Sequence, residues 1–362
     1  MFEKYDPLKD EMFRVMDDKG ELIDPKLKPA IPDQDVIDAY KLMQFARTAD
    51  LMSVSYQRQG RMLTYPPNLG QEAIAAAAGK IMKPQDWLVP AFRELGAYLA
   101  KGAKLSDIFL VWGGHEDGSR FSDAPNFIPS AVPIASQLPH AVGIGWAVNY
   151  KKEDSVVFAF VGDGGTSEGD FHEALNFAGV WKVPVIFIIQ NNQYAISVPV
   201  RKQTASRNLA VKSTAYGIPG IKVDGNDFFA MYAALEEAAA HARQGKGAVL
   251  IEAVTFRMGA HTTSDDPTLY RTKEEEKMWA EKDPIKRLSA YLIARGLRQE
   301  SDDEALLEQY KKEVEKEFAV YENYPPYKLE DVFKYHYKEM PGELKRQQAA
   351  YEKFLNSREV QK

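Results

Sequence analysis

Two side chains that carry oxygen donors, Asp163 and Asn192, each follow an apolar run and are the strongest candidates for chemistry in this sequence. Asp163 lies in the turn Gly-Asp-Gly-Gly, and Asn192 is the second residue of an Asn-Asn pair. Carboxylate and amide oxygens suit Mg²⁺, which prefers to complete its octahedral coordination with phosphate oxygens and water. Backbone N–H groups of a glycine turn and of a following helix N-terminus bind phosphate groups. The pattern therefore predicts a site for magnesium and a diphosphate.

The elements that must position these two residues read as one βαβ unit. Residues 155–161 and 185–189 are apolar runs rich in β-branched and aromatic residues, as in strands buried on both faces of a parallel sheet. Between them an apolar face at helical spacing predicts a helix, and Ser167 with Asp170 resembles its capping box. Because parallel strands end at the same edge of a sheet, Asp163 and Asn192 should be neighbours.

The rest of the chain extends this alternation of strands and helices. Further strands are expected at 220–225 and 248–256, separated by an Ala-rich helix around 228–243. This order predicts an α/β fold with a doubly wound, mostly parallel sheet. We expect an N-terminal arm and helix at 1–60, the α/β domain that carries the site at 61–272, and a helical C-terminal extension at 273–362.

The spacing of Gly-Asp-Gly and Asn-Asn resembles the thiamine diphosphate signature, and the wider chain resembles the alpha subunits of 2-oxo-acid dehydrogenases. That family's motifs occur in the family's order over roughly residues 35 to 275, with the pyruvate dehydrogenases of Gram-positive bacteria as the closest resemblance. The matching stretches are Gly70-Gln71-Glu72-Ala73, Phe92-Arg93, Gln137 with Pro139, the site unit, His261-Thr-Thr-Ser264-Asp-Asp-Pro267 and Tyr270-Arg271.

The resemblance implies thiamine diphosphate and Mg²⁺ as cofactors and assigns roles residue by residue. The implied metal ligands are the side chains of Asp163 and Asn192 and the backbone carbonyl of Tyr194. The implied catalytic residues, on the substrate side, are His261 and Ser264. The implied cofactor-binding set is Phe92, Arg93, Val132, Ile134, Asp163, Gly164, Gly165, Asn192, Tyr194, Ala195, Ile196, Arg257 and His261. Phe92 stands where relatives carry tyrosine, so a phenolic contact to the diphosphate is not expected here.

The same resemblance implies the activity and the partners. The expected reaction is decarboxylation of a 2-oxo acid, most closely pyruvate, with transfer of the acyl fragment to a lipoyl group on a partner acyltransferase. A beta subunit is expected to supply the glutamate that activates the cofactor, so this chain should be half of an active site in an α₂β₂ heterotetramer. Branched-chain 2-oxo-acid dehydrogenases and acetoin-cleaving enzymes share the signature, and a noncatalytic scaffold with a thiamine-type fold is the alternative from another class.

Other interpretations of single residues are less specific. Without a functional role, Asp163 would belong to a capped turn and Asn192 to a loop at the end of a strand. Arg93 and Arg257 would be surface ion-pair partners. The glycine turn is a poor dinucleotide fingerprint, because Ser167 stands where that fingerprint needs Gly or Ala, and the chain has no Walker-type Gly-Lys-Ser/Thr.

Composition excludes several classes of protein. The 362 residues carry a formal net charge of -6 with mixed signs, which gives no basic footprint for nucleic acid. No run approaches the length of a membrane span, and the acidic start does not resemble a targeting peptide, so no membrane partner and a cytoplasmic location are expected. The chain has no cysteine, which excludes disulfides and thiolate chemistry.

The polar loop at 258–272 is longer than most connections, and it follows a predicted strand on the edge that carries the site. We expect it to fold over the cofactor and to become ordered when cofactor and metal bind. Ser264, in this loop, aligns with a regulatory phosphorylation site of mitochondrial relatives.

Overall fold

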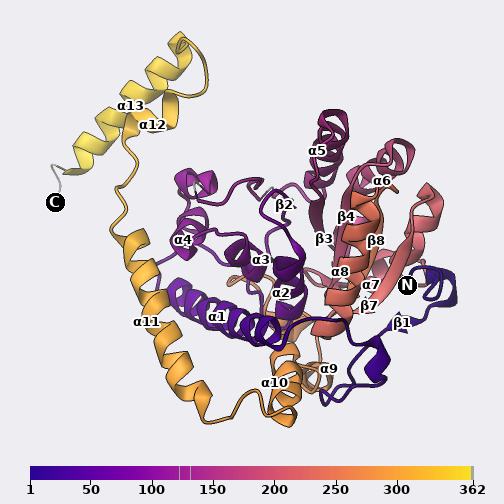
Figure 1. Ribbon diagram of the computed structural model, residues 1–362. Coiled ribbons are helices and arrows are strands. Elements are labelled where there is room, and N and C mark those ends of the chain that lie inside the picture. Colours follow the sequence, from indigo (N-terminus) through magenta and orange to yellow (C-terminus); the bar gives the residue numbers. More distant parts are fainter. Residues whose placement is uncertain (122, 131, 360–362) are drawn as a thin grey trace. The chain divides into compact units, whose positions relative to one another are not determined.

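A parallel sheet of six strands forms the centre of the computed structural model, which describes residues 1–121, 123–130 and 132–359. The strand order is β1-β7-β8-β4-β3-β2, and every neighbouring pair is parallel (Figure 1). The strands are β1 (Met12–Phe13), β2 (Trp87–Val89), β3 (Val157–Gly162), β4 (Val185–Asn191), β7 (Gly220–Asp224) and β8 (Val249–Val254). A separate antiparallel pair joins β5 (Tyr194–Ala195) to β6 (Val198–Pro199). The predicted α/β fold is confirmed.

Helices cover both faces of this sheet. The helices of the described chain as a whole are α1 (Asp33–Arg58), α2 (Glu72–Ile81), α3 (Leu95–Ala100), α4 (Leu105–Trp112), α5 (Gln137–Lys151), α6 (Gly169–Trp181), α7 (Val200–Gln203), α8 (Phe228–Arg243), α9 (Lys273–Ala280), α10 (Pro284–Ala294), α11 (Asp302–Glu322), α12 (Leu329–Phe333) and α13 (Gly342–Glu359). Short 3-10 turns are η1 (Pro7–Lys9), η2 (Pro25–Leu27), η3 (Glu116–Arg120), η4 (Gly164–Ser167), η5 (Ala210–Tyr216) and η6 (Pro267–Leu269).

Alternate residues of the central strands supply the two hydrophobic layers. Phe158 and Phe160 of β3 join the cluster that also contains residues of α1, α2, α8 and α10. Val157 and Val161 face the other way, into the cluster with residues of α5 and α6, which lie side by side (Figure 1). Because each strand is buried on both faces, it reads as a continuous apolar run, which is why the sequence predicted β3, β4 and β8 closely.

The register of the central strands aligns their carboxyl ends. Gly162 of β3 pairs with Gln190 of β4, and Asn191 of β4 pairs with Val254 of β8. The residues that follow these three strands therefore emerge at one edge of the sheet, beside the residues that follow β2. This alignment places the predicted site at the carboxyl edge, where ligands bind in open α/β sheets.

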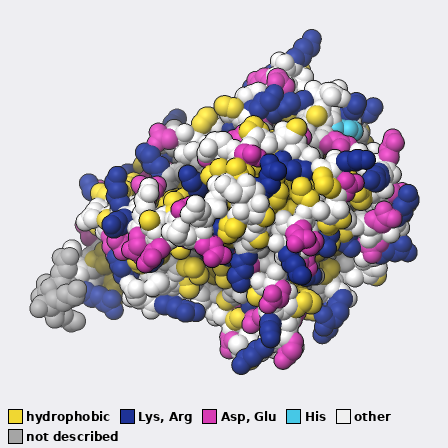
Figure 2. Space-filling model, turned by 60° about the horizontal axis from the view of Figure 1, so that its bottom comes forward, with side chains coloured by type: hydrophobic (Ala, Val, Ile, Leu, Met, Phe, Trp, Pro, Cys, Tyr) yellow, Lys and Arg dark blue, Asp and Glu magenta, His cyan; other side chains and the backbone are white. Residues whose placement is uncertain are grey.

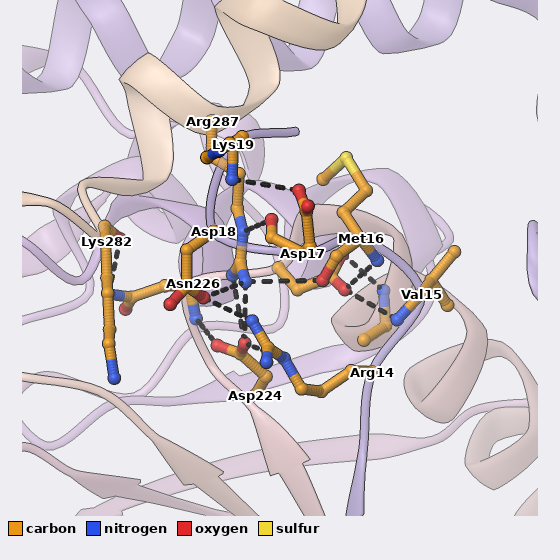
Figure 3. A network of polar contacts seen from close by, with 12 residues as sticks. Arg14, Val15, Met16, Asp17, Asp18, Lys19, Asp224, Asn226, Lys282 and Arg287 are labelled. Carbon is orange, nitrogen blue, oxygen red and sulfur yellow. Dashed lines mark hydrogen bonds and ion pairs between the residues drawn. The ribbon is translucent and has the colours of Figure 1, made fainter. Parts of the chain in front are cut away.

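The N-terminal arm is tied to this sheet by a strand and by a buried polar network (Figure 3). Strand β1 pairs with β7. Arg287 of α10 donates to Asp224 through Nη1 at 3.0 Å and through Nη2 at 2.9 Å, and Arg14 donates to the same carboxylate oxygen at 3.0 Å. Asp227 accepts from the backbone N–H groups of Val15 at 2.7 Å and of the next residue at 2.6 Å. The sequence did not predict β1 or β2, because strands of two or three residues are too short to show a hydrophobic pattern.

The predicted capping box at Ser167 is wrong. The chain first makes the 3-10 turn η4, so α6 begins only at Gly169, after Glu168. Ser167 instead donates its hydroxyl to the carbonyl of Gln203 at 3.4 Å. Ser167 therefore belongs to the 3-10 turn and does not cap the helix.

The chain divides into two compact units, Met1–Phe318 and Ala319–Lys362. The second unit contains α12 and α13, and the rings of Tyr351 and Phe354 on α13 stack with centroids 5.9 Å apart. On the face of the molecule in Figure 2, Lys and Arg side chains are interspersed with Asp and Glu, with hydrophobic side chains between them. Within the described ranges, no helix has the length and apolarity that crossing a bilayer requires.

Candidate active site

A cavity of about 240 Å³ lies at the carboxyl edge of the sheet. Its lining comes from the ends of β3 and β4, from the residues after β2, β3, β4 and β8, and from the residues just before α2 and around the start of α5. The lining residues are Gln71, Ala91, Phe92, Arg93, Glu94, Ile134, Ala135, Gln137, Val161, Gly162, Asp163, Gly164, Gly165, Glu168, Gln190, Asn192, Tyr194, Ala195, Ile196, Arg257 and His261. Residues that the sequence separates by more than 150 positions thus meet in one place.

Asp163 and Asn192 place two oxygen donors in this cavity. Asp163 is 2% exposed, and burial raises the pKa of its carboxyl group to about 6. Gln203 donates to its Oδ2 at 2.7 Å. The amide nitrogen of Asn192 donates to Gln71 Oε1 at 3.1 Å, which turns the amide, while its Oδ1 is buried and has no hydrogen-bond partner in the described part of the chain. A buried acceptor without a donor is costly, and a cation would satisfy it.

Two glycines of the turn after β3 lie too close to their neighbours to carry a side chain. A Cβ on Gly164 would lie 2.6 Å from the Cβ of Ala195, and one on Gly165 would lie 2.5 Å from Val161 Cγ2. Both distances are shorter than side chains tolerate. The turn and η4 therefore present bare backbone beside Asp163, as a diphosphate cradle requires.

Two buried arginines face the cavity, and neither has a carboxylate partner in the described ranges. Arg93 is 6% exposed and Arg257 is 1% exposed. Arg93 donates through Nη1 to the carbonyl of Pro67 at 2.6 Å, and Arg257 donates to the carbonyls of Tyr194 at 3.0 Å and Ile196 at 2.7 Å. Among the described residues neither guanidinium forms an ion pair. Burial, followed by the charge of Arg257, lowers the pKa of Arg93 to about 9.

His261 lies between the two arginines. Arg93 donates through Nη2 to its Nδ1 at 3.0 Å, and Arg257 approaches the same atom at 3.4 Å. Burial, followed by the charges of Arg93 and Arg257, lowers the pKa of His261 to about 4. The ring is therefore neutral near pH 7, and because Nδ1 accepts, the proton lies on Nε2. His261 can donate one hydrogen bond to an anion or a substrate.

Asp265 and Tyr270 hold this arrangement from the loop. The backbone N–H of His261 donates to Asp265 Oδ2 at 2.7 Å, and the hydroxyl of Tyr270 donates to the same oxygen. Arg257 donates to the hydroxyl of Tyr270 at 3.1 Å. The conformation of the loop is thus coupled to the position of the arginine.

Two residues that line the cavity have a strained backbone. Ile196 has a φ of 54° and Ala135 a φ of 68°, values that a β-branched or other L-residue rarely adopts. The carbonyl of Ile196 accepts from Arg257 Nη2 at 2.7 Å, which helps to hold this turn. Backbone strain of this kind persists where the surroundings enforce it and is common at functional sites.

The structure brings together most of the residues singled out in the sequence. Phe92, Arg93, Ile134, Asp163, Gly164, Gly165, Asn192, Tyr194, Ala195, Ile196, Arg257 and His261 line the cavity. Val132 is 78% exposed and Ser264 is exposed on the loop, and neither belongs to the lining. Their predicted contacts with cofactor and substrate stay predictions.

Sequence reasoning missed the polar floor of the cavity. Glu94 is fully buried, burial raises the pKa of its carboxyl group to about 8, and Gln190 donates its amide to it. Gln203, which holds Asp163, was also missed. The signal available was position: Gln190 is the residue before the last of β4, which leads to Asn192, and Glu94 follows Arg93 directly.

The residues present fit a magnesium diphosphate group. The two side-chain oxygens and the carbonyl of Tyr194 are hard donors of the kind that Mg²⁺ takes, although that carbonyl also accepts from Arg257. An anion would find hydrogen-bond donors and positive charge in the same cavity. They come from the backbone of the glycine turn, the guanidinium groups of the two arginines and a neutral imidazole N–H.

Comparison with known proteins agrees with this geometry. Residues 40–330 match the model of the family described as "Dehydrogenase E1 component". The chain is 46% identical to "Pyruvate dehydrogenase E1 component subunit alpha" of Acholeplasma laidlawii over 94% of this chain and 99% of that protein. It is 38% identical to the protein of the same name from Bacillus subtilis, over 94% and 92% of the two chains.

A third relative carries another name. "3-methyl-2-oxobutanoate dehydrogenase subunit alpha" of Mycobacterium tuberculosis is 48% identical over a shorter stretch, 74% of this chain and 73% of that protein. All three relatives are named as alpha subunits of 2-oxo-acid dehydrogenases. This chain belongs to the dehydrogenase E1 component family, whose members use thiamine diphosphate.

Proposed function

We propose that this chain is the alpha subunit of a pyruvate dehydrogenase E1 component. In this proposal it works with a beta subunit in an α₂β₂ heterotetramer, decarboxylates pyruvate with thiamine diphosphate and Mg²⁺, and passes the acetyl fragment to a lipoyl group on a partner acyltransferase. The match to pyruvate dehydrogenase alpha subunits over nearly the whole chain supports the choice of substrate.

One observation carries the proposal. The buried oxygens of Asp163 and Asn192 and the unpaired cations Arg93 and Arg257 line the same cavity, which also contains the bare glycine turn. A cation site next to an anion site, both desolvated, is the complement of a metal diphosphate.

The residues of this chain have separate tasks in this scheme. Asp163, Asn192 and the carbonyl of Tyr194 would hold Mg²⁺, and the N–H groups of the glycine turn with Arg93 and Arg257 would hold the diphosphate. When bound, thiamine diphosphate supplies a carbon nucleophile and an electron sink for decarboxylation of a 2-oxo acid. His261 would donate its Nε2 proton in a hydrogen bond to the substrate carboxylate or to the diphosphate.

The proposal is tested by decarboxylation in the complex that contains this chain and its copurifying partners. Pyruvate and 3-methyl-2-oxobutanoate are compared as substrates, with and without thiamine diphosphate plus Mg²⁺. Cofactor-dependent activity that favours pyruvate is the expected result. No cofactor-dependent activity with either substrate would overturn the proposal and return attention to acetoin cleavage or to a noncatalytic scaffold.

The branched-chain alternative rests on a specific observation, the 48% identity to the mycobacterial relative. Its match leaves about a quarter of both chains unaligned, whereas the pyruvate relatives match over more than nine tenths of this chain. Preference for 3-methyl-2-oxobutanoate in the same assay would select it.

Catalysis by the complex should also need both subunits. The alpha chain alone is expected to show no turnover of pyruvate with cofactor and metal present, because in this family the activating glutamate is expected on the beta subunit. Turnover by the isolated alpha chain at the rate of the complex would refute the shared site.

A further inference from the structure

Helix α9 contacts the segment that carries the proposed third metal ligand. The hydroxyl of Tyr194 donates to Glu275 Oε2 at 2.7 Å, while its carbonyl accepts from Arg257 Nη1 at 3.0 Å. Glu275 lies in the first turn of α9, 81 residues further along the chain. Tyr194 is thus held at its side chain by α9 and at its carbonyl by an arginine of the cavity.

The carboxylate of Glu275 makes this contact in place of a local one. Thr272 is the N-cap of α9 and accepts from the backbone N–H of Glu275 at 3.1 Å. Thr-x-x-Glu is the sequence of a capping box, in which the glutamate would return to the N–H of the N-cap residue. The first half of that box is present, but the carboxylate points to Tyr194.

A second set of contacts ties α9 to the segment that carries Arg257 and His261. The rings of Phe256 and Trp279 stack at 5.3 Å with an interplanar angle of 6°, and the guanidinium of Arg271 lies 5.2 Å above Phe256. Arg271 donates to the carbonyls of Arg257 and Gly259 and pairs with Glu276 of α9 at 3.2 Å. The helix therefore contacts both segments that line this side of the cavity.

We propose that Glu275 is a positioning residue for the metal end of the site. By fixing the phenol of Tyr194, it fixes the direction of the Tyr194 carbonyl toward the bound cation, although Glu275 itself does not line the cavity. This inference rests on the proposed function, because it takes Mg²⁺ and thiamine diphosphate as the ligands.

The neighbouring residue provides a matched control. Glu274 lies in the same turn, has the same charge and is exposed. Replacing either glutamate removes one negative charge from the helix N-terminus, so the electrostatic cost to α9 is shared. Any difference between the two variants reports the contact with Tyr194.

The test measures the Mg²⁺ concentration that half-saturates thiamine diphosphate binding in the reconstituted complex, by calorimetry, together with the Tm of the ligand-free complex. We expect Glu275→Ala and Tyr194→Phe each to raise that concentration about fivefold, the effect of losing one partly exposed hydrogen bond. The double variant should lose no more than either single variant. Glu275→Gln, which keeps an acceptor oxygen, and Glu274→Ala should bind like the wild type.

Each other outcome has a defined meaning. If Glu275→Ala binds like Glu274→Ala, or if the two single effects add in the double variant, the positioning role is wrong. If Glu275→Ala weakens Mg²⁺-dependent binding and also lowers the Tm, and Glu275→Gln restores neither, the contact is merely structural. That result also overturns the inference. If the wild-type complex shows no Mg²⁺-dependent binding at all, the proposed function itself fails.

Discussion

At the scale of single residues, Asp163 is buried at a cost that a ligand would remove. Its pKa is raised from 3.8 to about 6 by burial, so the folded chain holds this proton more tightly than the unfolded chain does. The free energy of unfolding of the ligand-free chain therefore falls as the pH rises from 3.8 to about 6. Asp163→Asn removes the cost, and we expect it to raise the free energy of unfolding of the ligand-free chain at about pH 7.5 by on the order of 2 kcal/mol.

Urea unfolding of both proteins measures this difference, and repetition at about pH 4, where the carboxyl group is protonated in the folded state, is the control. The gain in stability should come with a loss of function, since the variant should no longer be stabilised by Mg²⁺ plus thiamine diphosphate. A variant that is less stable than the wild type near neutral pH and equally stabilised by both ligands would contradict this account.

His261 should report the arrival of the diphosphate. Burial and the charges of Arg93 and Arg257 lower its pKa to about 4, and an anion bound to those guanidinium groups would offset their charges. We expect inorganic diphosphate with Mg²⁺ to raise this pKa toward the ordinary value, as measured by NMR titration of the ring. Mg²⁺ alone is the control, and a midpoint that diphosphate leaves unchanged would place the anion elsewhere.

At the scale of elements, Gly164 and Gly165 in the turn between β3 and α6 should tolerate no side chain. A Cβ on Gly164 or Gly165 meets Ala195 or Val161 at 2.6 Å or 2.5 Å, so Gly164→Ala or Gly165→Ala must displace the turn. We expect each change to weaken thiamine diphosphate binding at least tenfold, about 1.4 kcal/mol, in equilibrium titration.

Gly169→Ala is the matched control for these variants. Gly169 is the first residue of α6, and its added Cβ would meet only Glu173 Oε1 at 3.9 Å. It should bind like the wild type, and because alanine favours helix it should be no less stable. Normal binding by Gly164→Ala would remove the turn from the site.

The elements that the sequence predicted are those with long patterns. Strands β3, β4 and β8 are apolar on both faces, and α8 has a sustained helical period, so pattern alone located them. The order Gly-Asp-Gly and Asn-Asn placed Asp163 and Asn192 at one edge. Contacts made by tertiary packing were not predictable. Gln203 contacts Asp163 and Glu275 contacts Tyr194, and no sequence pattern links the segments that these pairs join.

At the scale of the whole first unit, the N-terminal arm should contribute to stability through Arg287. Its guanidinium is buried between Asp18 and Asp224, and removing it would leave Arg14 as the one ion-pair partner of Asp224 among the described residues (Figure 3). We expect Arg287→Met to lower the free energy of unfolding by about 3 kcal/mol, the usual cost of removing one partner from a buried ion pair, as measured by denaturant unfolding.

Arg295→Met is the control on the same helix, because Arg295 is exposed at the C-cap of α10 and surface changes of this kind cost about 0.5 kcal/mol or less. If Arg287→Met and Arg295→Met unfold alike, the network is not what holds the arm to the sheet.

The proposed function depends on a metal diphosphate at the carboxyl edge, held by Asn192 Oδ1, which has no hydrogen-bond partner among the described residues, and by its neighbours. The most direct measurement is calorimetric titration of thiamine diphosphate into the ligand-free complex, with and without Mg²⁺, for the wild type and for Asn192→Ala. The account predicts Mg²⁺-dependent binding by the wild type and weak, Mg²⁺-independent binding by the variant. Equal, Mg²⁺-dependent binding by both proteins would contradict it.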